Sequence, residues 1–374
     1  MLGALLLVLL CTVGCGLDPE PQDSGPDTAP QPLCQVKGFA NQALEWSLPE
    51  DPFGSLRLPA DPNSGDANWA LLGLGSERLD LVYAFPGTEL GWRILDNSGQ
   101  GFESEREWVL PGVLQDQLRQ VENQGPEGLA WHLLELTGDG QEDLVITRLP
   151  GSDELGLSYW LIYAGEEGGF ADTATRFDLP LAMRGTRYQL RDQQGDGRPD
   201  LWIELEEGFQ VHLAVDGGFS TASVELRTPS AEGQLVDLNG DALQDWFTGD
   251  GLAWGLETGF GPLQPLDMLP ATGTLLDLPG HGLMEWVDTQ SGPYEWTRYS
   301  LEPSTLGIAV GQVTLPQGYP QESFIGSQGI TGRIWYGVKD LDGDGALDLI
   351  VTRVEGSPEI GVQLWRVHLG LCET

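Results

Sequence analysis

A nine-residue acidic frame recurs six times along the chain and limits the possible folds more than any other feature. Its clearest copy is DLDGDGALD, which runs from Asp340 to Asp348 and leads directly into the β-prone run LIV. Short apolar runs such as LVY, LVI, LWI, WF and WV follow the other copies. Each frame therefore predicts a turn that enters a strand. The six copies are residues 72–80, 135–143, 192–200, 237–245, 277–285 and 340–348.

A Gly-Phe pair, followed nine to ten residues later by Pro, gives a second count of the same repeats. It occurs at residues 38–39, 101–102, 169–170, 218–219 and 259–260, and a degenerate copy with Ile in place of Phe lies at 307–308. A further strand is expected between each frame and the next pair, so each repeat holds about four short strands. The last acids of successive frames are 40 to 63 residues apart. Repeats of this kind predict an all-β propeller of six four-stranded blades.

The two markers are out of phase at the chain ends. The first Gly-Phe element (38–49) has no acidic frame before it, and the last frame (340–348) has no Gly-Phe element after it. The N-terminal segment is therefore expected to supply the outer part of the last blade, which closes the ring and removes exposed sheet edges. A strand that ends near Leu371 should then stop where the segment at Cys34 begins.

The N-terminus is typical of an export signal. Residues 2–13 are apolar except for Gly3 and Thr12, and this length suits a signal peptide better than a spanning helix. The segment 12–15, TVGC, resembles a bacterial lipobox, in which Cys15 becomes the lipidated first residue; an ordinary signal peptide is the alternative. We expect a signal peptide at 1–15, a flexible Pro- and Asp-rich tether at 16–33 and the propeller at 34–374.

These N-terminal features predict a protein on the bacterial outer membrane, at the cell surface or in the periplasm, held to the membrane by its lipid anchor only. Cys11 leaves with the signal and Cys15 carries lipid, so Cys34 and Cys372 remain as partners. Disulfides persist in exported proteins, and we predict a Cys34–Cys372 bond, with two free buried thiols as the alternative.

Charge excludes one class of partner. The chain of 374 residues has 57 acidic and 18 basic residues, which gives a formal net charge of -39. A protein this acidic does not bind nucleic acid or anionic membrane through a basic surface. Acidic residues that serve as cation ligands explain part of the excess, and the rest keeps the protein soluble.

The last frame has the ligand pattern of a calcium loop. Asp340, Asp342 and Asp344 stand at its first, third and fifth positions, and Gly345 permits the tight turn that brings them together. Asp348 stands at the ninth position, whereas an EF-hand places its last ligand at the twelfth. The spacing predicts bound Ca²⁺; the alternative is a bare acidic turn whose repulsion is screened by water.

These frames and Gly-Phe pairs resemble the FG-GAP/VCBS repeat family, which includes the propellers of integrin alpha subunits. The resemblance covers residues 34 to 372 and implies calcium in loops on one face, together with a role in adhesion or ligand binding. Integrin propellers have seven blades, so seven is the alternative to the six counted here. The resemblance implies no metal in frames 72–80 and 277–285, which have lost the pattern. The implied ligands are Asp340, Asp342, Asp344 and Asp348; Asp237, Asn239, Asp241 and Asp245; Asp192, Gln194, Asp196 and Asp200; and, more loosely, Glu135, Asp139 and Asp143.

Two classes of function compete. One is a binding or adhesion module braced by calcium, and the other is a hydrolase or lyase, since propellers also host enzymes. None of the four histidines, His132, His212, His281 and His368, lies in a metal-ligand or nucleophile motif, and no acidic pair stands out as catalytic. We therefore expect a monomeric, non-enzymatic protein that binds a protein or glycan ligand.

A lectin is a third possibility, because the 13 tryptophans could stack on sugars. Trp92, Trp108, Trp160 and Trp365, however, recur at blade positions, where core packing is the expected role.

Overall fold

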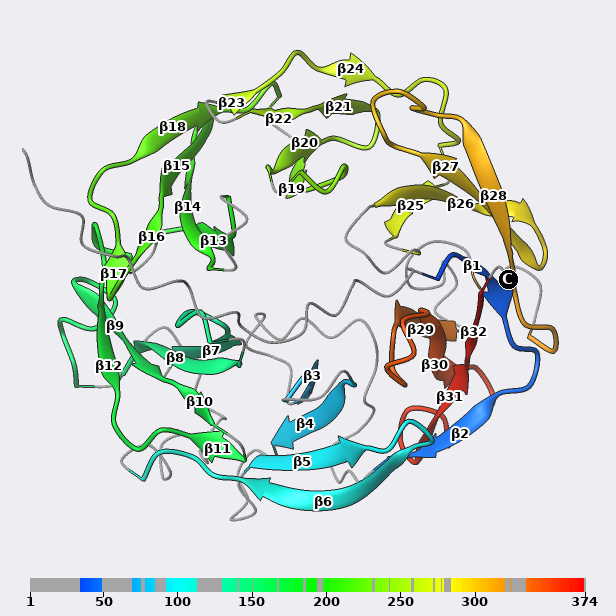
Figure 1. Ribbon diagram of the computed structural model, residues 1–374, viewed down its shortest axis with the longest axis horizontal. Coiled ribbons are helices and arrows are strands. Elements are labelled where there is room, and N and C mark those ends of the chain that lie inside the picture. The colour runs from blue at the N-terminus through cyan, green and yellow to red at the C-terminus, as the bar shows by residue number, and fades with distance from the viewer. Residues whose placement is uncertain are drawn as a thin grey trace, which may run out of the picture. The chain divides into compact units, whose positions relative to one another are not determined.

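Six blades, each with four antiparallel strands, follow one another around a ring in the computed structural model (Figure 1), and two further strands extend the sheet in each of two blades. The described residues are 34–48, 69–74, 78–84, 92–112, 130–139, 141–149, 151–166, 168–183, 186–193, 198–230, 233–241, 243–256, 259–271, 273–276, 278, 284–319, 324 and 334–372. They form strands, turns and loops only. The predicted all-β propeller with six blades is confirmed.

The blades are numbered here in chain order, with the innermost strand of each blade first. Blade 1 contains β3 (Trp69–Leu72), β4 (Asp80–Ala84), β5 (Trp92–Asn97) and β6 (Phe102–Trp108). Blade 2 contains β7 (Ala130–Leu134), β8 (Asp143–Arg148), β9 (Tyr159–Tyr163) and β12 (Thr175–Asp178). Blade 3 contains β13 (Tyr188–Arg191), β14 (Asp200–Leu205), β15 (Gly208–His212) and β18 (Val224–Arg227).

The second half of the ring repeats this order. Blade 4 contains β19 (Gln234–Val236), β20 (Asp245–Phe247), β21 (Gly251–Ala253) and β24 (Gln264–Pro265). Blade 5 contains β25 (Gly273–Leu276), β26 (Glu285–Gly292), β27 (Glu295–Ser300) and β28 (Ala309–Thr314). Blade 6 contains β29 (Ile334–Lys339), β30 (Asp348–Val354), β31 (Leu364–His368) and the N-terminal β2 (Leu44–Ser47).

The last acid of every frame is the first residue of the second strand of its blade. This holds for Asp80, Asp143, Asp200, Asp245, Glu285 and Asp348. Each frame is therefore the turn that leads from the innermost strand into the next one. The acidic frame marks the same point of each blade, as its regular place in the sequence predicted.

The hydrophobic core is divided among the six interfaces between neighbouring blades. One cluster of buried side chains lies at each interface, since both faces of a blade pack against other blades. The four tryptophans predicted to be core, Trp92, Trp108, Trp160 and Trp365, are at most 2% exposed. They pack between blades, which confirms their structural role.

Short hairpins on the outer side explain the Gly-Phe pairs. They are β10 (Gly165–Glu166) with β11 (Gly169–Phe170), β16 (Ala214–Val215) with β17 (Gly218–Phe219), and β22 (Gly255–Leu256) with β23 (Gly259–Phe260). Three of the Gly-Phe glycines pair in parallel with the outer edge of the preceding blade: Gly169 with Val109, Gly218 with Asp178, and Gly38 with Thr314. A Cβ at Gly169 or Gly218 would lie 2.8 or 2.6 Å from the carbonyl oxygen of its partner. Glycine is therefore required because two backbones approach closely.

In two of these hairpins the phenylalanine packs on an aromatic residue of the preceding blade. Phe170 stacks on Trp108 with 4.6 Å between ring centroids, and Phe219 meets Phe177 edge-on at 4.9 Å. Trp108 and Phe177 both stand two positions before a Leu-Pro pair, at residues 110–111 and 179–180. This contact between blades explains why the phenylalanine of the Gly-Phe pair recurs.

Replacement of Gly218 by Ala tests this close approach. The added methyl group would meet the carbonyl oxygen of Asp178, so we expect the free energy of unfolding to fall by about 2 kcal/mol, the usual cost of overpacking. Gly112→Ala is the matched control, because no atom of the described residues lies within 4 Å of a Cβ at that position. Chemical denaturation measures both variants, and equal stabilities would contradict the role assigned to Gly218.

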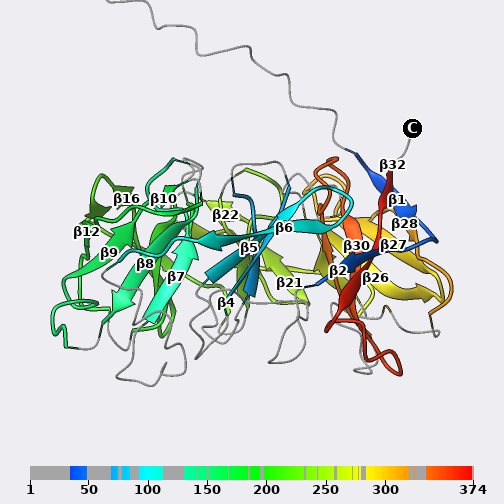
Figure 2. The same cartoon turned by 90° about the horizontal axis from the view of Figure 1, so that it is seen from below.

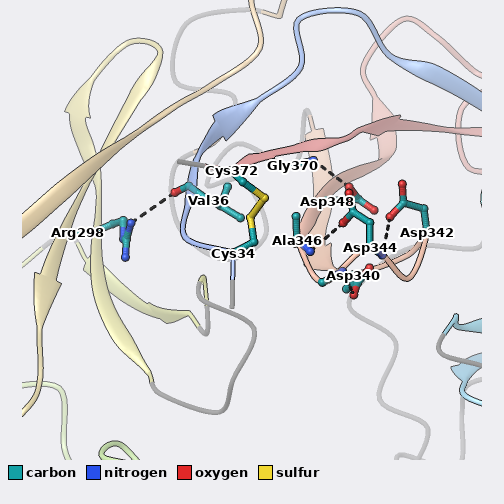
Figure 3. Close-up of a disulfide and its surroundings, with 11 residues drawn as sticks. Cys34, Val36, Arg298, Asp340, Asp342, Asp344, Ala346, Asp348, Gly370 and Cys372 are labelled. Atoms are coloured by element: carbon teal, nitrogen blue, oxygen red, sulfur yellow. Dashed lines mark hydrogen bonds between the residues drawn. A yellow bond between two sulfur atoms is a disulfide. The ribbon is translucent and has the colours of Figure 1, made fainter. Parts of the chain in front are cut away.

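The two ends of the chain close the ring. The outermost strand of blade 6 is β2, which pairs with β31, and β1 (Val36–Phe39) lies between β28 and β32 (Gly370–Cys372). Figure 2 shows β1, β28 and β32 together at one end of the ring. A disulfide joins Cys34 to Cys372, with 5.3 Å between their Cα atoms (Figure 3). The predicted closure and the predicted disulfide are both confirmed.

Candidate metal centre

The turn between β29 and β30 gathers carboxylates at one point. One oxygen each from Asp340, Asp342 and Asp348 lies within 4.8 Å of the other two. Gly343 and Gly345 adopt positive φ angles of 77° and 84°, which only glycine adopts easily, and these angles allow the turn to fold back on itself. Three carboxylate oxygens this close could hold a hard cation, which prefers oxygen ligands.

Backbone N–H groups orient the carboxylates of this loop. Asp340 accepts hydrogen bonds from the N–H groups of Gly343 (2.8 Å) and Gly345 (3.0 Å), one on each oxygen. Asp342 accepts one from Asp344 at 3.2 Å, and the Asp344 side chain accepts one from Ala346 at 2.8 Å. Figure 3 shows the four aspartates clustered along the turn. Asp344, the fourth predicted ligand, is exposed and lies outside the group of three.

The electrostatics of the loop favour a bound cation. Burial raises the pKa of Asp340 and of Asp342, and repulsion from the Asp344 carboxylate raises both further. For Asp348, burial and the charges of Asp342 and Asp344 raise the pKa to about 7, although backbone hydrogen bonds oppose this shift. Negative charge is thus costly in this turn, and a divalent cation would offset the cost.

The ninth residue of the frame has a structural role that the sequence did not predict. Asp348 is 1% exposed, and its two oxygens accept hydrogen bonds from the N–H groups of Leu341 (3.1 Å) and Gly370 (2.9 Å). It therefore links the start of its own turn to the chain just beyond the third strand of the blade. Figure 3 shows the bond to Gly370, two residues before Cys372.

Other blades use the same carboxylate link, which makes it a property of the repeat. In each case the carboxylate accepts hydrogen bonds from backbone N–H groups on both sides: Asp143 from Leu136, Thr137 and Gly165; Asp200 from Gln193 and Ala214; and Asp245 from Leu238 and Gly255. Burial is the main cause that raises the pKa of Asp245 to about 6. The sequence of frame 72–80 contained an indication of this role, because the frame has no acid at its other ligand positions and still keeps Asp80. The Asp80 side chain accepts a hydrogen bond from the N–H of Asn97 at 2.8 Å.

Blade 5 replaces this link with an ion pair. Its frame ends in Glu285, whose two oxygens accept hydrogen bonds from Arg298 at 2.6 and 2.7 Å. The Arg298 side chain is 4% exposed, so the pair is desolvated and bidentate, a geometry that gives strong charge-assisted bonds.

Frame 237–245 is built like frame 340–348. Asp237 accepts the N–H of Gly240 at 2.8 Å, and Asn239 accepts that of Asp241 at 3.1 Å. The side chain of Asp241 accepts the N–H of Leu243 at 2.9 Å and the amide of Asn239 at 2.9 Å. Among the described residues, however, the carboxylates of this frame do not meet at one point as those of Asp340, Asp342 and Asp348 do.

The two weaker frames are described in part. Glu135 accepts the N–H of Gly138 at 2.7 Å, and Asp139 accepts that of Gln141 at 2.9 Å, so the turn of blade 2 is held by its own carboxylates. Asp192 and Asp200 flank the turn of blade 3, while Gln194 and Asp196 lie outside the described residues. Metal ligation by these frames stays a prediction.

The turn of blade 6 is also in contact with blade 1. Arg78 donates to the carbonyl oxygen of Asp342 at 2.9 Å, and the Asn97 amide donates to that of Leu341. The candidate metal centre therefore lies at the joint where the last blade meets the first. The sequence indicated neither residue: Arg78 belongs to a frame without the ligand pattern, and Asn97 lies outside every frame.

The described histidines take part in structural hydrogen bonds. The Nδ1 atoms of His212 and His368 bond the carbonyl oxygens of Ser220 (2.8 Å) and Ala40 (2.7 Å), which both follow a Gly-Phe pair. The Nε2 atom of His368 bonds the hydroxyl of Tyr319 at 2.7 Å. His132 lies 3.3 Å from the hydroxyl of Tyr188, and His281 lies outside the described residues.

Acid should loosen the N-terminal closure through His368. Burial lowers the pKa of this histidine below its usual value near 6.5, so the unfolded chain takes up a proton at a higher pH than the folded one. The stability contributed by neutral His368 is therefore full above about pH 6.5 and is lost as the pH falls below it. Hydrogen exchange, corrected for intrinsic rates, should show weaker protection of residues 36–48 at pH 5 than at pH 7.5. Equal protection at both values would contradict this prediction.

Comparison with known proteins gives the fold but no family. No protein-family model matches the sequence, and no curated protein matches it. The chain is similar to a chain of the Photorhabdus luminescens Tc holotoxin pore, with 17% identity and a TM-score of 0.55 over 89% of its length. The match spans only 15% of that toxin chain. At this identity the likeness shows a shared fold alone, and the FG-GAP/VCBS resemblance stays a prediction.

Two further solved structures are similar at lower scores. An Agrocybe aegerita lectin that recognises non-reducing terminal N-acetylglucosamine has 17% identity and a TM-score of 0.47, over 77% of this chain and 75% of the lectin. A streptogramin B lyase has 13% identity and a TM-score of 0.37, over 88% of this chain and 98% of the lyase. In the described part of the chain, no helix has the length and apolar character needed to cross a membrane. The chain is a six-bladed β-propeller whose ring is closed by its own N-terminal strands and a disulfide.

Proposed function

We propose that this protein is an exported binding or adhesion module, tethered to a bacterial membrane by lipid on Cys15 and braced by calcium. The observation that carries the calcium part is the convergence of the Asp340, Asp342 and Asp348 carboxylates at one turn. The ion acts as a brace and takes part in no reaction, because its ligands come from a turn between strands. The ligand is a protein or a glycan at the cell surface or in the periplasm, and the module is a monomer.

The contacts of the turn support a bracing role. Arg78 and Asn97 hold its backbone carbonyl groups from blade 1, and Asp348 holds Gly370 next to the disulfide. A cation that fixes the turn would therefore stabilise the joint between the last and first blades, together with the C-terminal strand. The other frames lack this combination of a carboxylate group and a disulfide among the described residues.

The disulfide supports an address outside the cytoplasm, where such bonds persist. The signal peptide, Cys15 and the tether at 16–33 lie outside the described residues, so the anchor rests on the lipobox-like segment alone.

Cys15→Ser tests the anchor. We expect this variant to move from the membrane pellet to the soluble fraction, because one thioether-linked lipid group is the only attachment proposed. Wild-type protein should partition into detergent and carry labelled fatty acid. A Cys11→Ser variant should behave like wild type, and a Cys15→Ser protein that stays in the pellet would contradict lipidation.

A ligand screen tests the binding role. The soluble Cys15→Ser protein should bind some members of a glycan array or of a panel of surface proteins, and chelator should weaken this binding if the calcium brace supports the binding face. Retention of a bound glycan without turnover supports a binding module. Its cleavage would favour the hydrolase or lyase alternative, and binding to anionic polymers in general would argue against specificity.

A further inference from the structure

A cavity of about 480 Å³ lies between blades 4 and 5 and is not part of the turn at 340–348. Its walls are formed by β19 and β25, the innermost strands of these blades, and Arg191 at the end of β13 completes it from blade 3. Figure 1 shows β13, β19 and β25 on the inner side of the ring. Arg191 and Gln234 are exposed, so the cavity can be reached from solvent.

One wall of the cavity contains Gly273, the first residue of β25, and the side chain of Trp286. A Cβ at Gly273 would overlap the indole of Trp286, which covers this position and is held by a hydrogen bond from its Nε1 to the carbonyl oxygen of Pro270 at 2.9 Å. Trp286 and Phe247 are 6% and 5% exposed, and their rings lie 5.6 Å apart. These two packed aromatic rings form the apolar part of a wall that also contains Arg191, Gln234 and Thr274, and small-molecule sites combine apolar surface with a few polar groups in this way.

The cation at this cavity has no acidic partner within the described residues. Arg93, Arg106, Arg176, Arg187, Arg198, Arg298 and Arg366 all form ion pairs, whereas Arg191 forms none. Its backbone is fixed, because its carbonyl oxygen accepts the Nε1 hydrogen of Trp202 at 3.2 Å. Among the described residues, Arg227 and Arg353 also form no ion pair, but neither of them lines this cavity.

We propose that this cavity binds a small organic carboxylate with a planar or branched apolar body. The carboxylate pairs with Arg191, whose planar fork matches two carboxylate oxygens, and Gln234 offers an amide donor beside it. The apolar body lies against Phe247, Leu275 and Trp286. Ligands of this kind usually occupy cavities of roughly 300 to 1,000 Å³. This site is independent of the calcium brace and of the surface ligand.

Matched acids and amides separate the charge from the apolar body. The probes are 3-phenylpropionate, indole-3-acetate and hexanoate, each with its neutral amide, measured against the full chain by saturation-transfer NMR and calorimetry. We expect at least one acid to bind about tenfold more tightly than its amide, the factor expected when one charge-assisted pair is added. No binding by any acid up to 10 mM, or equal affinity of every acid and its amide, would overturn the proposal.

Variants then assign the effect to the cavity. Arg191→Gln should remove the preference for acid over amide and leave the melting temperature unchanged, whereas Arg191→Lys should keep part of the preference. Arg187→Gln is the control, since Arg187 is exposed, lies in the same blade segment and pairs with Glu204 instead. A preference that survives in Arg191→Gln would place the bound acid elsewhere and refute the site. The preference for acid over amide depends neither on chelator nor on the surface ligand. A failure of this site can therefore be distinguished from a failure of the proposed function.

Discussion

Replacement of both Cys34 and Cys372 by Ser should lower the free energy of unfolding by up to about 6 kcal/mol. The bond closes a loop of 338 residues, and the chain-entropy model gives this figure for a loop of that length. It is an upper figure, because measured gains from disulfides are often smaller than the model. The double variant should still fold, since β1 stays paired with β28 and β32 and β2 stays paired with β31.

Denaturation with and without reductant measures this effect. Reductant should destabilise the wild-type protein to the level of the double variant and leave the double variant unchanged. Hydrogen exchange should increase first in β1, β2 and β32, which the bond connects. Equal stability of the two proteins, or free thiols at both positions in the exported protein, would contradict the assigned role.

Calcium should raise the free energy of unfolding by about 2.7 kcal/mol when its free concentration is 100 times the dissociation constant of one site. For a domain of this size the melting temperature should rise by about 4 °C. Asp342→Asn should abolish this response. The same change should leave the metal-free protein equally stable or slightly more stable, because it removes a carboxylate whose pKa is raised by burial and by its acidic neighbours.

Asp288→Asn is the matched control for this variant. Asp288 accepts the N–H of the residue two positions ahead, Gln290, just as Asp342 accepts that of Asp344, but it lies outside every frame. Its calcium response should equal that of the wild type. A melting temperature that does not change between calcium and chelator in the wild type would exclude the brace, and an equal response in Asp342→Asn would move the ion to another frame.

The architecture could be predicted from the sequence because its markers sit where backbone geometry changes. The ninth acid of each frame starts a strand, and each Gly-Phe pair lies where the chain meets the preceding blade. The out-of-phase ends then determined the closure, including the pairing of Cys34 with Cys372.

The finer parts of the site could not be predicted in this way. Asp348 bonds backbone N–H groups of Leu341 and Gly370, and backbone groups leave no trace in the choice of residue. Arg78 contacts a turn that is 264 positions away in the sequence, so nothing local to it indicates the partner. The cavity beside Arg191 is lined by residues of three blades that lie between positions 191 and 286, so no local sequence pattern indicates it.

The position of β1 and β2 also sets the order in which the ring can form. Synthesis begins at the N-terminus, so these two strands are made first, yet their partners β31 and β32 are made last. Until the final residues arrive, β2 and the edge of β1 that pairs with β32 stay unpaired, and Cys34 is open to other thiols. A ribosome that stops before residue 364 would therefore release a chain with five complete blades, in which β2 and one edge of β1 are unpaired; such a chain is a natural substrate for chaperones and for thiol exchange.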